Sequence, residues 1–380
     1  MKIRATWMRG GTSKGLFFRA QDLPAEPAAR DRMLLRAMGS PDPYGTQIDG
    51  LGGATPSTSK VVLVRQSRRE DCDVEYLFGA VSIREARIDW SGNCGNLTAA
   101  VAPFAIAQGL HRPAAEGTVC VRMWQDNIGQ RILTHVAVRA GEVVEEGAFA
   151  LDGVAFPSSE IRLEFLDPGA DPESGGGPLF PTGHLSDLWE APGFGVCAIT
   201  LLTAGAPTLF VRAQDLGLSG SELQSQLEVA KAAREALVTL RRRAAMLLGL
   251  AASEAEADAA SPHVPRVAFV APPRDYQASG GKAVRADETD LAVRILSLGR
   301  LHQAMTGTGA VALAVAAAVP GTVVAEAAGG ARESVRFGHP SGVLEVGASV
   351  RRGDSGEWQA TRVVMSRSAR RLMEGEVFVP

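Results

Sequence analysis

The chain has 380 residues, of which 46% are hydrophobic and 21% are charged, and this is the composition of a folded protein long enough for two cores. It excludes disordered, collagen-like and disulfide-scaffold proteins. The 39 basic and 42 acidic residues give a formal net charge of −3, so no overall positive field attracts a nucleic-acid backbone, and we expect no nucleic-acid partner.

The first residues and the longest apolar run bear on localisation. Met1–Trp7 runs into a glycine-rich turn and lacks the apolar core of a signal peptide. Ala310–Val319 is about half as long as the roughly 20 residues of a membrane span. We therefore expect a cytoplasmic protein without membrane contact. The cysteines are widely spaced, with no CxxC pair and no histidine at ligand spacing, so we expect neither a metal site nor disulfides.

The first motif in the chain is Arg9–Gly15, with the sequence RGGTSKG. Its glycines and the hydroxyls of Thr12 and Ser13 offer hydrogen-bond donors to an anion. It lacks the G-x-x-x-x-G-K-[ST] spacing of a nucleotide-binding P-loop, so we interpret it as a carboxylate site rather than a phosphate site. A helix is predicted next, over Asp31–Met38.

Short strands are predicted for most of the chain, because β-branched residues cluster in short runs. Lys60 opens one of these runs, close to the small residues Gly52–Ala54. Apolar surroundings lower the pKa of a lysine toward the value that a general base needs, so Lys60 is a candidate catalytic base. The alternative interpretation is an ordinary solvated lysine at the start of a strand. The clearest strand runs are Lys60–Val64, Val119–Met123, His135–Val138, Val267–Val270 and Gly321–Val324.

Two predicted helices are apolar on all sides, and such helices must be buried on all sides. One follows Gly95 and the other begins at Gly307, and both are embedded in strand-rich sequence. This repetition suggests two similar α/β halves, each with strands wrapped around a central helix.

Cys94 lies in the segment Asp89–Asn96 (DWSGNCGN), directly before the first of these helices. The dipole and the unpaired backbone amides at a helix amino end favour a thiolate, so Cys94 is the cysteine with a local reason to be reactive. The same amides would bind a carboxylate. Packing of a small apolar thiol is the alternative.

The boundary between the halves is expected in the loop-rich stretch Asp167–Pro192, where Gly175–Pro178 and Pro181 break regular structure. We place residues 1–185 in the first half and residues 186–361 in the second half. In an alternative division, the C-terminal residues 362–380 also belong to the first half.

A longer helix is predicted to start at Ser221, with Glu222 in its first turn. We interpret Arg241–Arg243 on this helix as a solvated face and Ala251–Ala260 as an exposed connector. The apolar face of the helix is formed by Leu223, Leu227, Leu237 and Leu240.

The spacing Gly307-x-Gly309-x-x-Ala312, with Glu326 downstream, matches a dinucleotide-binding fingerprint. Such a site requires an apolar strand before the glycines, and residues 298–305 are not one. We therefore expect no nicotinamide cofactor.

These motifs together resemble one family, the 2-methylaconitate cis-trans isomerases (PrpF family), relatives of 4-oxalomesaconate tautomerases and 3-methylitaconate isomerases. The segments Leu291–Met305, Arg336–Gly342 and Met365–Gly375, together with Trp90, favour the methylaconitate branch. The resemblance implies an α/β (α+β) diaminopimelate epimerase-like fold of two pseudo-symmetric halves, each a central helix wrapped by mostly antiparallel strands, with the active site in the cleft between them. It covers nearly the whole chain, through Met8–Phe18, Gly39–Gly53, Ser57–Lys60, Asp89–Leu97, Phe180–Gly183, Leu291–Met305, Arg336–Gly342 and Met365–Gly375.

The resemblance also implies a set of site residues. Lys60 and Cys94 would face each other across the substrate as the catalytic pair. Thr306 stands where epimerases of this fold have a second cysteine, and since threonine cannot act as a thiolate base, Lys60 has to join Cys94 in acid–base chemistry. The substrate-binding residues implied are Thr12, Ser13, Gln47, Ser59, Asn93, Gly95 and Asn96 in the first half, and Arg266, Ser297, His302 and the amides of Gly307 and Thr308 in the second.

The implied activity is the isomerisation of trans-2-methylaconitate to its cis form, a step of propionate breakdown through the methylcitrate route, by proton transfer without a cofactor or metal. One alternative is a sister isomerase acting on oxalomesaconate or methylitaconate. Another is a non-catalytic accessory protein of an iron–sulfur dehydratase. The implied partner is a small tricarboxylate, with a functional link to such a dehydratase. The sequence leaves open the exact acid, the oligomeric state and which of Lys60 and Cys94 takes the first proton.

Overall fold

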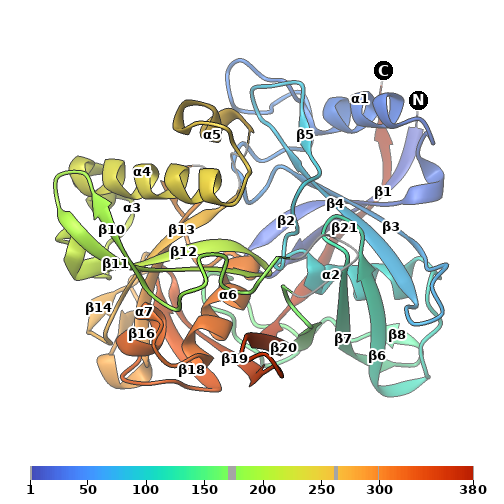
Figure 1. Ribbon diagram of the computed structural model, residues 1–380. Coiled ribbons are helices and arrows are strands. Elements are labelled where there is room, and N and C mark those ends of the chain that lie inside the picture. Colours follow the sequence, from blue (N-terminus) through green and yellow to red (C-terminus); the bar gives the residue numbers. More distant parts are fainter. Residues whose placement is uncertain (1, 170–176, 261–263, 298, 380) are drawn as a thin grey trace. The chain divides into compact units, whose positions relative to one another are not determined.

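The computed structural model describes residues 2–169, 177–260, 264–297 and 299–379. Gly175, Gly176 and Leu298, which entered the sequence analysis, lie outside these residues. The chain divides into two compact units, one formed by Met1–Glu164 with Ser366–Pro380 and the other by Phe165–Met365 (Figure 1).

The first boundary between the units falls within strand β9 (Ile161–Leu166), just before the loop Asp167–Pro192 in which we expected it. Pro178 and Leu179 of that loop belong to the second unit and form hydrogen bonds within it. The Thr203 hydroxyl donates to the carbonyl of Pro178 over 2.9 Å, and the Thr203 amide donates to that of Leu179 over 2.9 Å. That the two halves are domains stays a prediction.

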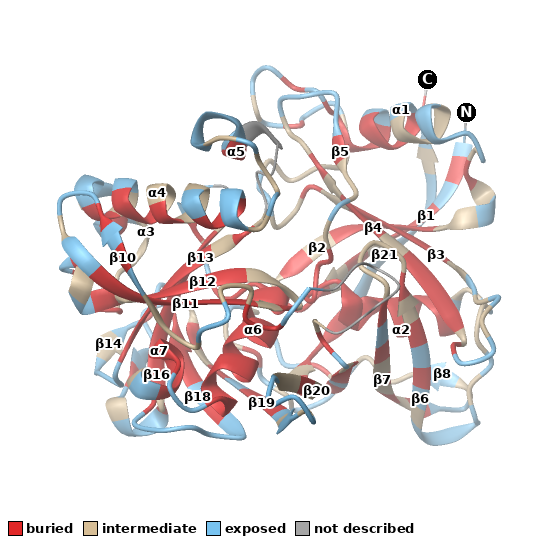
Figure 2. Cartoon of the chain, in the orientation of Figure 1, coloured by how far each residue is buried: buried red, intermediate tan, exposed pale blue. Residues whose placement is uncertain are grey.

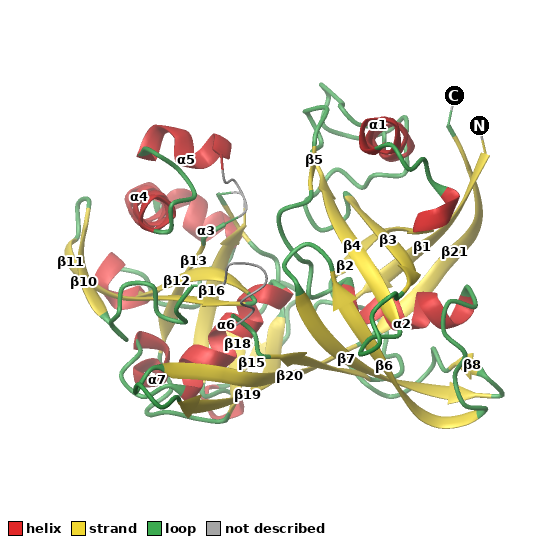
Figure 3. Cartoon of the chain, turned by 45° about the vertical axis from the view of Figure 1, so that its right-hand side comes forward, coloured by secondary structure: helices red, strands yellow, loops and turns green. Residues whose placement is uncertain are grey.

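In the first unit, mostly antiparallel strands pack around helix α2 (Thr98–Ala107), as Figure 3 shows. Strand β1 (Lys2–Gly10) pairs antiparallel with β2 (Ser13–Arg19) and with β21 (Ala369–Phe378), so the two ends of the chain lie side by side. Strand β2 continues parallel to β3 (Lys60–Gln66). The other elements are η1 (Ala20–Asp22), α1 (Pro27–Met38), β4 (Val74–Val81), β5 (Ile88–Asp89), β6 (Glu116–Gln125), β7 (Gln130–Arg139) and β8 (Glu142–Val143).

The second unit repeats this plan around helix α6 (Gly307–Ala318), which packs against β11, β12, β18 and β19. Its strands also pair mostly antiparallel. Its elements are β10 (Asp187–Ala191), β11 (Gly195–Ala204), β12 (Ala206–Arg212), η3 (Ala213–Leu216), α3 (Gln224–Val229), α4 (Lys231–Leu247), α5 (Glu254–Ala260), β13 (Arg266–Ala271), β14 (Tyr276–Gln277), β15 (Ala283–Val284), η4 (Ala286–Glu288), β16 (Leu291–Ser297), β17 (Arg300–Leu301), α7 (Val323–Ala327), β18 (Ser334–His339), β19 (Gly342–Arg352) and β20 (Trp358–Arg367).

The two central helices are buried as their composition predicts. Every residue of α6 is buried, and so is α2 from Thr98 to Ile106, as the red ribbons of Figure 2 show. Neither helix carries a charged side chain, so neither has a face that needs water. The predicted α/β class with a central helix in each half is therefore confirmed.

Four of the five predicted strand runs are confirmed, as parts of β3, β6, β7 and β13. The fifth, Gly321–Val324, is wrong because helix α7 begins at Val323. The Thr322 hydroxyl caps this helix by accepting a hydrogen bond from the amide of Ala325 over 3.0 Å, and this local bond outweighs the strand preference of the valines.

The other corrections also come from polar side chains. Helix α1 begins at Pro27, earlier than predicted, because the Glu26 carboxylate caps it. The helix predicted from Ser221 begins only at Gln224, since Glu222 folds back to accept from the amide of Ser219, and it divides into α3 and α4. The expected connector Ala251–Ala260 contains helix α5, and strand β10 lies within the expected loop.

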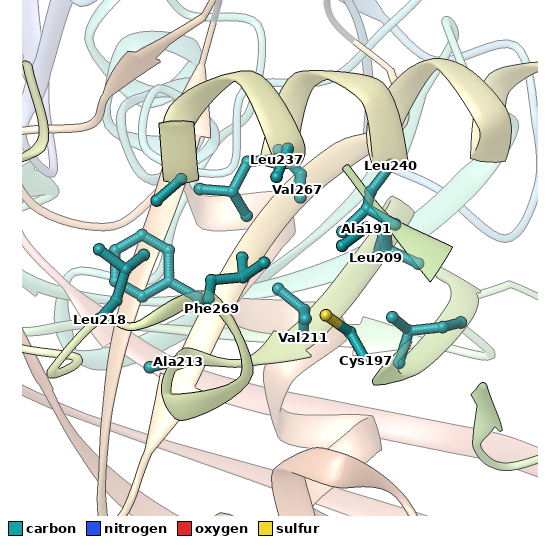
Figure 4. Close-up of a cluster of buried hydrophobic side chains, with 14 of the residues drawn as sticks. Ala191, Cys197, Leu209, Val211, Ala213, Leu218, Leu237, Leu240, Val267 and Phe269 are labelled. Carbon is teal, nitrogen blue, oxygen red and sulfur yellow. The ribbon is translucent and has the colours of Figure 1, made fainter. Parts of the chain in front are cut away.

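Helix α4 covers a cluster of buried hydrophobic residues in the second unit (Figure 4). Leu237 and Leu240 point from the helix onto strand residues such as Leu209, Val267 and Phe269, and all five are buried. Arg241 and Arg242 are not a solvated face, because both pair with Asp258 of α5. No helix in the described part of the chain is long and apolar enough to cross a membrane.

The start of α2 lies directly against the turn between β1 and β2. A Cβ atom on Gly10 would come within 2.6 Å of the Asn96 carbonyl oxygen and 2.9 Å of the Leu97 Cα. We expect Gly10→Ala to lower the free energy of unfolding by about 1–3 kcal/mol, because the backbone of one element has to move. Urea unfolding checks this, with Gly92→Ala as the control, since no heavy atom lies within 4 Å of a Cβ there. Equal midpoints for the two variants would contradict the prediction.

Candidate active site

Lys60 and Cys94 are in contact in the first unit. Lys60 is the first residue of β3, and Cys94 lies in the loop that leads into α2. The Lys60 Nζ donates to the Cys94 Sγ over 3.3 Å, and it also lies 5.1 Å from the centre of the Phe78 ring. The Cys94 residue is 8% exposed, so its sulfur is shielded from bulk water, whereas Lys60 is half-buried. Low polarity strengthens the attraction between the two charges.

The pKa of the Cys94 thiol is lowered below its ordinary value. Burial is the largest influence and acts in the opposite direction, because it disfavours the charged thiolate. The Lys60 ammonium and the backbone N–H groups of Leu97 and Asn96 together outweigh burial. These amides form the entry of α2, which is the environment that the sequence predicted for Cys94.

A buried hydrogen-bond network holds the loop around Cys94. The Thr98 hydroxyl donates to the Cys94 carbonyl over 3.0 Å, and the Tyr76 hydroxyl donates to the Asn93 Oδ1 over 3.2 Å. Burial raises the pKa of Tyr76, which keeps its hydroxyl neutral. The Asn93 Nδ2 is buried and has no hydrogen-bond partner among the described residues. Sequence reasoning missed Tyr76 and Thr98 because both lie in otherwise apolar elements.

Arg367, also missed from the sequence, is buried beside the same loop. Its Nε donates to the Asn96 Oδ1 over 3.2 Å, and its Nη1 donates to the Ser366 carbonyl over 2.9 Å. Burial lowers the pKa of Arg367 to about 10, and the charge of Cys94 acts in the opposite direction. Within the described residues, no carboxylate forms an ion pair with Arg367. Its signal in the sequence was the motif Met365–Gly375, which holds three arginines that the sequence could not rank by burial.

The other three cysteines lie in environments that oppose a thiolate. Burial is the main cause in each case, and it raises the pKa of Cys72 to about 11 and raises those of Cys120 and Cys197. A lowered pKa leaves more thiolate at neutral pH, by a factor of about ten for each pKa unit.

We therefore expect iodoacetamide at neutral pH to alkylate Cys94 ahead of the other cysteines, although Cys120 is more exposed. The rate should fall as the pH is lowered through the depressed pKa of Cys94. Peptide mass spectrometry across a pH series measures both effects, and Cys94→Ser identifies the peptide. Earlier labelling of Cys120 would contradict the lowered pKa.

The turn between β1 and β2 brings Thr12 and Ser13 to the entry of α2. The Asn96 Nδ2 donates to the Thr12 hydroxyl over 3.2 Å, and Ser13 is buried. Gly11 has a φ of 51°, and a Cβ there would lie 2.4 Å from the Asn96 Oδ1. Glycine at this position is thus needed for the close approach that joins the two motifs.

A cavity of about 630 Å³ opens beside this turn. Arg9 is anchored in its wall, where its guanidinium donates to the Ser368 carbonyl over 2.9 Å and to the Ser158 hydroxyl over 3.1 Å. Burial, and then the neighbouring Arg370, lower the pKa of Arg9. Lys60 and Cys94 do not line this cavity. Its polar lining includes Arg9, Thr12, Ser13, Lys14, Thr58, Glu145, Glu146, Ser158 and Arg370.

The side chains of Gln47 and Ser59 are hydrogen-bonded to each other. The Gln47 Nε2 donates to the Ser59 hydroxyl over 2.7 Å and to the Ser40 hydroxyl over 2.9 Å, and its Oε1 accepts from the Ala54 amide over 2.9 Å. Both amide hydrogens of Gln47 are used in this way. Gln47 therefore holds the loop that precedes Lys60, and a direct bond from it to a substrate would require one of these bonds to break.

The second unit gathers its own candidate residues at the amino end of α6. Arg266 begins β13 and Ser297 ends β16, and these strands are antiparallel neighbours, so both residues lie at the same end of the pair. The Arg266 Nε donates to the Thr308 hydroxyl in the first turn of α6 over 3.3 Å. His302 follows β17, which folds back on β16.

The amides of Gly307 and Thr308 belong to the first turn of α6, where helix N–H groups lack intrahelical acceptors. Thr306 caps this helix, because its hydroxyl accepts from the Gly309 amide over 3.2 Å. Thr306, for which the resemblance implies the position of an epimerase's second cysteine, is thus a capping residue in this structure. The His302 Nδ1 accepts from the Ala304 amide over 3.1 Å, so the neutral ring carries its proton on Nε2.

The candidate residues therefore form two clusters, one at the entry of each central helix. Gly95 lies in the first, between Cys94 and Asn96. Over the described residues, no three His, Cys, Asp or Glu side chains gather as a metal ion would require.

The whole chain, residues 1–380, matches the model of the family described as PrpF protein. The chain belongs to the PrpF family. It is 53% identical to the 2-methyl-aconitate isomerase of Shewanella oneidensis and 53% identical to that of Cupriavidus necator, covering 100% of this chain and 97% and 98% of those proteins. Its fold is similar to that of a crystal structure of methylitaconate-delta-isomerase, with a TM-score of 0.82, 35% sequence identity and coverage of 100% of this chain and 96% of the other.

Proposed function

We propose that this PrpF-family protein isomerises 2-methylaconitate between its trans and cis forms. Relatives that are 53% identical over their whole length are named isomerases of this acid, and the chain is an isomerase. The observation that carries the chemical part of the proposal is the contact between Lys60 Nζ and Cys94 Sγ. We assign the reaction to the methylcitrate route of propionate breakdown in the cytoplasm, next to an iron–sulfur dehydratase that handles the same acid.

The reaction needs one proton to leave and return. A base removes a proton from a carbon conjugated with the carboxylates, and the electron pair of that C–H bond delocalises over the former double bond. Rotation about this bond follows, and return of the proton to the same carbon restores the double bond in the other geometry. No atom or electron is gained or lost, so this chemistry requires no cofactor.

The lowered thiol pKa favours a resting pair of Cys94 thiolate and Lys60 ammonium. In this form the sulfur is the group that can accept the first proton, and the ammonium can stabilise the charge that develops on a substrate carboxylate. We therefore assign the base to Cys94 and the electrostatic partner to Lys60.

The substrate carboxylates need donors on the protein, because their charge would otherwise raise the pKa of the thiol. In the first unit we assign this role to Thr12, Ser13, Asn93 and the amides of Gly95 and Asn96, with Gln47 and Ser59 holding the loop. In the second unit we assign it to Arg266, Ser297, His302 and the amides of Gly307 and Thr308. Each set lies at the amino end of a buried helix, where carboxylates bind favourably.

The test is proton NMR of the purified protein with trans-2-methylaconitate in deuterated water, beside oxalomesaconate and methylitaconate. We expect the cis isomer to appear with deuterium at the exchanged carbon, and Lys60→Ala to slow both changes at neutral pH by about 10²- to 10⁴-fold. If the protein converted only oxalomesaconate or only methylitaconate, that acid would replace 2-methylaconitate as the proposed substrate. If none of the three acids were converted, the proposal would be overturned in favour of a non-catalytic accessory role.

A further inference from the structure

The contact between Lys60 and Cys94 brings together two groups that can react with each other as well as exchange protons. The Lys60 Nζ lies 3.3 Å from the Cys94 Sγ, so an amine nitrogen is already in contact with a sulfur atom. All four cysteines lie within the described residues and are free thiols. The side chain that bonds to the Cys94 sulfur is thus an amine and not a second thiol.

Cys94 is the cysteine best suited to react with a peroxide. The thiolate is the form of cysteine that peroxides oxidise. Against the effect of burial, the Lys60 ammonium and the backbone N–H groups of Leu97 and Asn96 lower the pKa of Cys94, whereas burial raises the pKa of the other three cysteines. Hydrogen peroxide is little larger than water and Lys60 is half-buried, so this oxidant can reach the pair.

Oxidation of the thiolate would also convert Lys60 into a nucleophile. The Cys94 sulfur attacks one oxygen of hydrogen peroxide, an S–O bond forms and the O–O bond breaks, so the sulfur loses the two electrons that the peroxide gains. The departing hydroxide takes a proton from the Lys60 ammonium and leaves as water. The products are a sulfenic acid on Cys94 and a neutral amine on Lys60. Loss of the thiolate charge also removes the group that favoured the ammonium.

The neutral amine can then attack the oxidised sulfur. An N–S bond forms and the S–O bond breaks, and the hydroxyl leaves as water with one hydrogen from the nitrogen, as when other sulfenic acids condense with nitrogen. The flexible four-carbon stem of Lys60 can close the gap of 3.3 Å, while the Thr98 hydroxyl holds the Cys94 carbonyl over 3.0 Å. The product is uncharged, and burial favours it over two separate charges.

We propose that Lys60 and Cys94 form a modification site, at which hydrogen peroxide joins the Lys60 Nζ to the Cys94 Sγ through a reversible sulfenamide bond. The bond occupies both groups of the proposed catalytic pair and therefore stops turnover. One small thiol attacks the sulfur and releases the amine, and a second thiol reduces the resulting disulfide to restore Cys94. The bond also protects the sulfur from oxidation to sulfinic acid, which thiols do not reverse. The chemistry rests on the contact itself, and only its effect on turnover rests on the proposed function.

Peptide mass spectrometry of the full chain after treatment with hydrogen peroxide at neutral pH tests the bond. We expect a joined peptide that links Lys60 to Cys94, with the summed mass of the two separate peptides less two hydrogen atoms, and its loss after dithiothreitol. Cys94→Ser should remove the joined peptide. Cys120→Ser, at the exposed cysteine of β6, is the matched control that leaves it in place.

Lys60→Arg separates the charge of Lys60 from its role as a nucleophile. Arginine keeps a cation beside the thiolate, but its guanidinium does not lose its proton and supplies no neutral amine. We expect the joined peptide to be lost in this variant and dimedone to trap the sulfenic acid of Cys94. Longer treatment should give sulfinic acid that dithiothreitol does not reverse. Thermal unfolding of each variant shows whether its fold is retained.

Three results would overturn the proposal. The first is an unaltered chain in which Cys94 stays a thiol or becomes a sulfinic acid without a joined peptide. The second is a link that retains an oxygen of the peroxide. The third is a Lys60→Arg variant that keeps its fold and in which dithiothreitol still recovers the Cys94 thiol completely. All three are read from masses, so they are independent of the turnover that tests the proposed function.

Discussion

Lys60→Met and Cys94→Ala are each expected to lower kcat/KM for 2-methylaconitate by about 10²- to 10⁴-fold, the range that one acid–base group contributes. The reason is their contact: the Lys60 Nζ donates to the Cys94 Sγ over 3.3 Å, so each residue sets the charge state of the other. The double variant should lose little more than either single variant, because residues that act as one unit are not additive.

Deuterium exchange separates the roles of the two residues. If the Cys94 thiolate is the base, Cys94→Ala loses both solvent exchange into the substrate and isomerisation. Lys60→Met also raises the thiol pKa, because it removes the main group that opposes burial, so its remaining activity should increase with pH. NMR in deuterated water at several pH values measures both quantities. Loss of exchange in Lys60→Met at every pH, with exchange retained in Cys94→Ala, would reverse the assignment.

Matched substitutions control for the loss of a lysine or a cysteine. Lys231→Met replaces an exposed lysine at the start of α4, and Cys120→Ser replaces the exposed cysteine of β6. Both are expected to keep kcat/KM within about twofold, because surface substitutions away from a site have small effects. A large loss in either control would mean that the effects of the Lys60 and Cys94 variants are not specific to the pair.

Arg367→Met is expected to give the second large effect, a fall in kcat/KM of about tenfold or more with a higher thiol pKa. Arg367 is buried, it bonds to Asn96, and its charge interacts with that of Cys94. Removing the cation takes away charge stabilisation of the thiolate and frees the Asn96 side chain that holds Thr12. The midpoint of Cys94 alkylation against pH should therefore shift upward, and this readout does not depend on turnover.

Arg367→Lys distinguishes charge from packing. A lysine keeps the positive charge but not the planar group that bonds to Asn96, so we expect an intermediate midpoint of alkylation. Arg131→Met, at an exposed arginine of β7, is the control and should leave the midpoint unchanged. If Arg367→Met lowered stability in urea but left the midpoint of alkylation in place, Arg367 would be a structural residue only.

The elements that depend on local pattern were predictable from the sequence. The uncharged runs after Gly95 and Gly307 predict helices buried on all sides, because a helix without a polar face has no side that water solvates favourably. The β-branched runs at Lys60 and Val267 predict strands, because β-branched side chains favour the extended backbone. Elements bounded by a single polar side chain were missed, such as α7, whose start depends on the Thr322 hydroxyl.

The candidate site divides in the same way. Cys94 before a buried helix and the glycines of Arg9–Gly15 were visible because helix ends and tight turns have local signatures. Family motifs added Lys60 as the partner of Cys94. The sequence could not show that Gln47 uses both amide hydrogens on serines, since those bonds join residues from separate parts of the loop.

The amino-acid sequence by itself determined the class of fold, the two central helices and the cysteine most suited to become a thiolate, because each follows from composition or from neighbours along the chain. Only the tertiary structure decided what surrounds that thiol. Lys60 comes from a strand, Tyr76 from the next strand and Arg367 from a segment more than 250 residues further on. Burial and charge interactions depend on distance in space, so the groups that set the pKa of Cys94 are known only once the chain is folded.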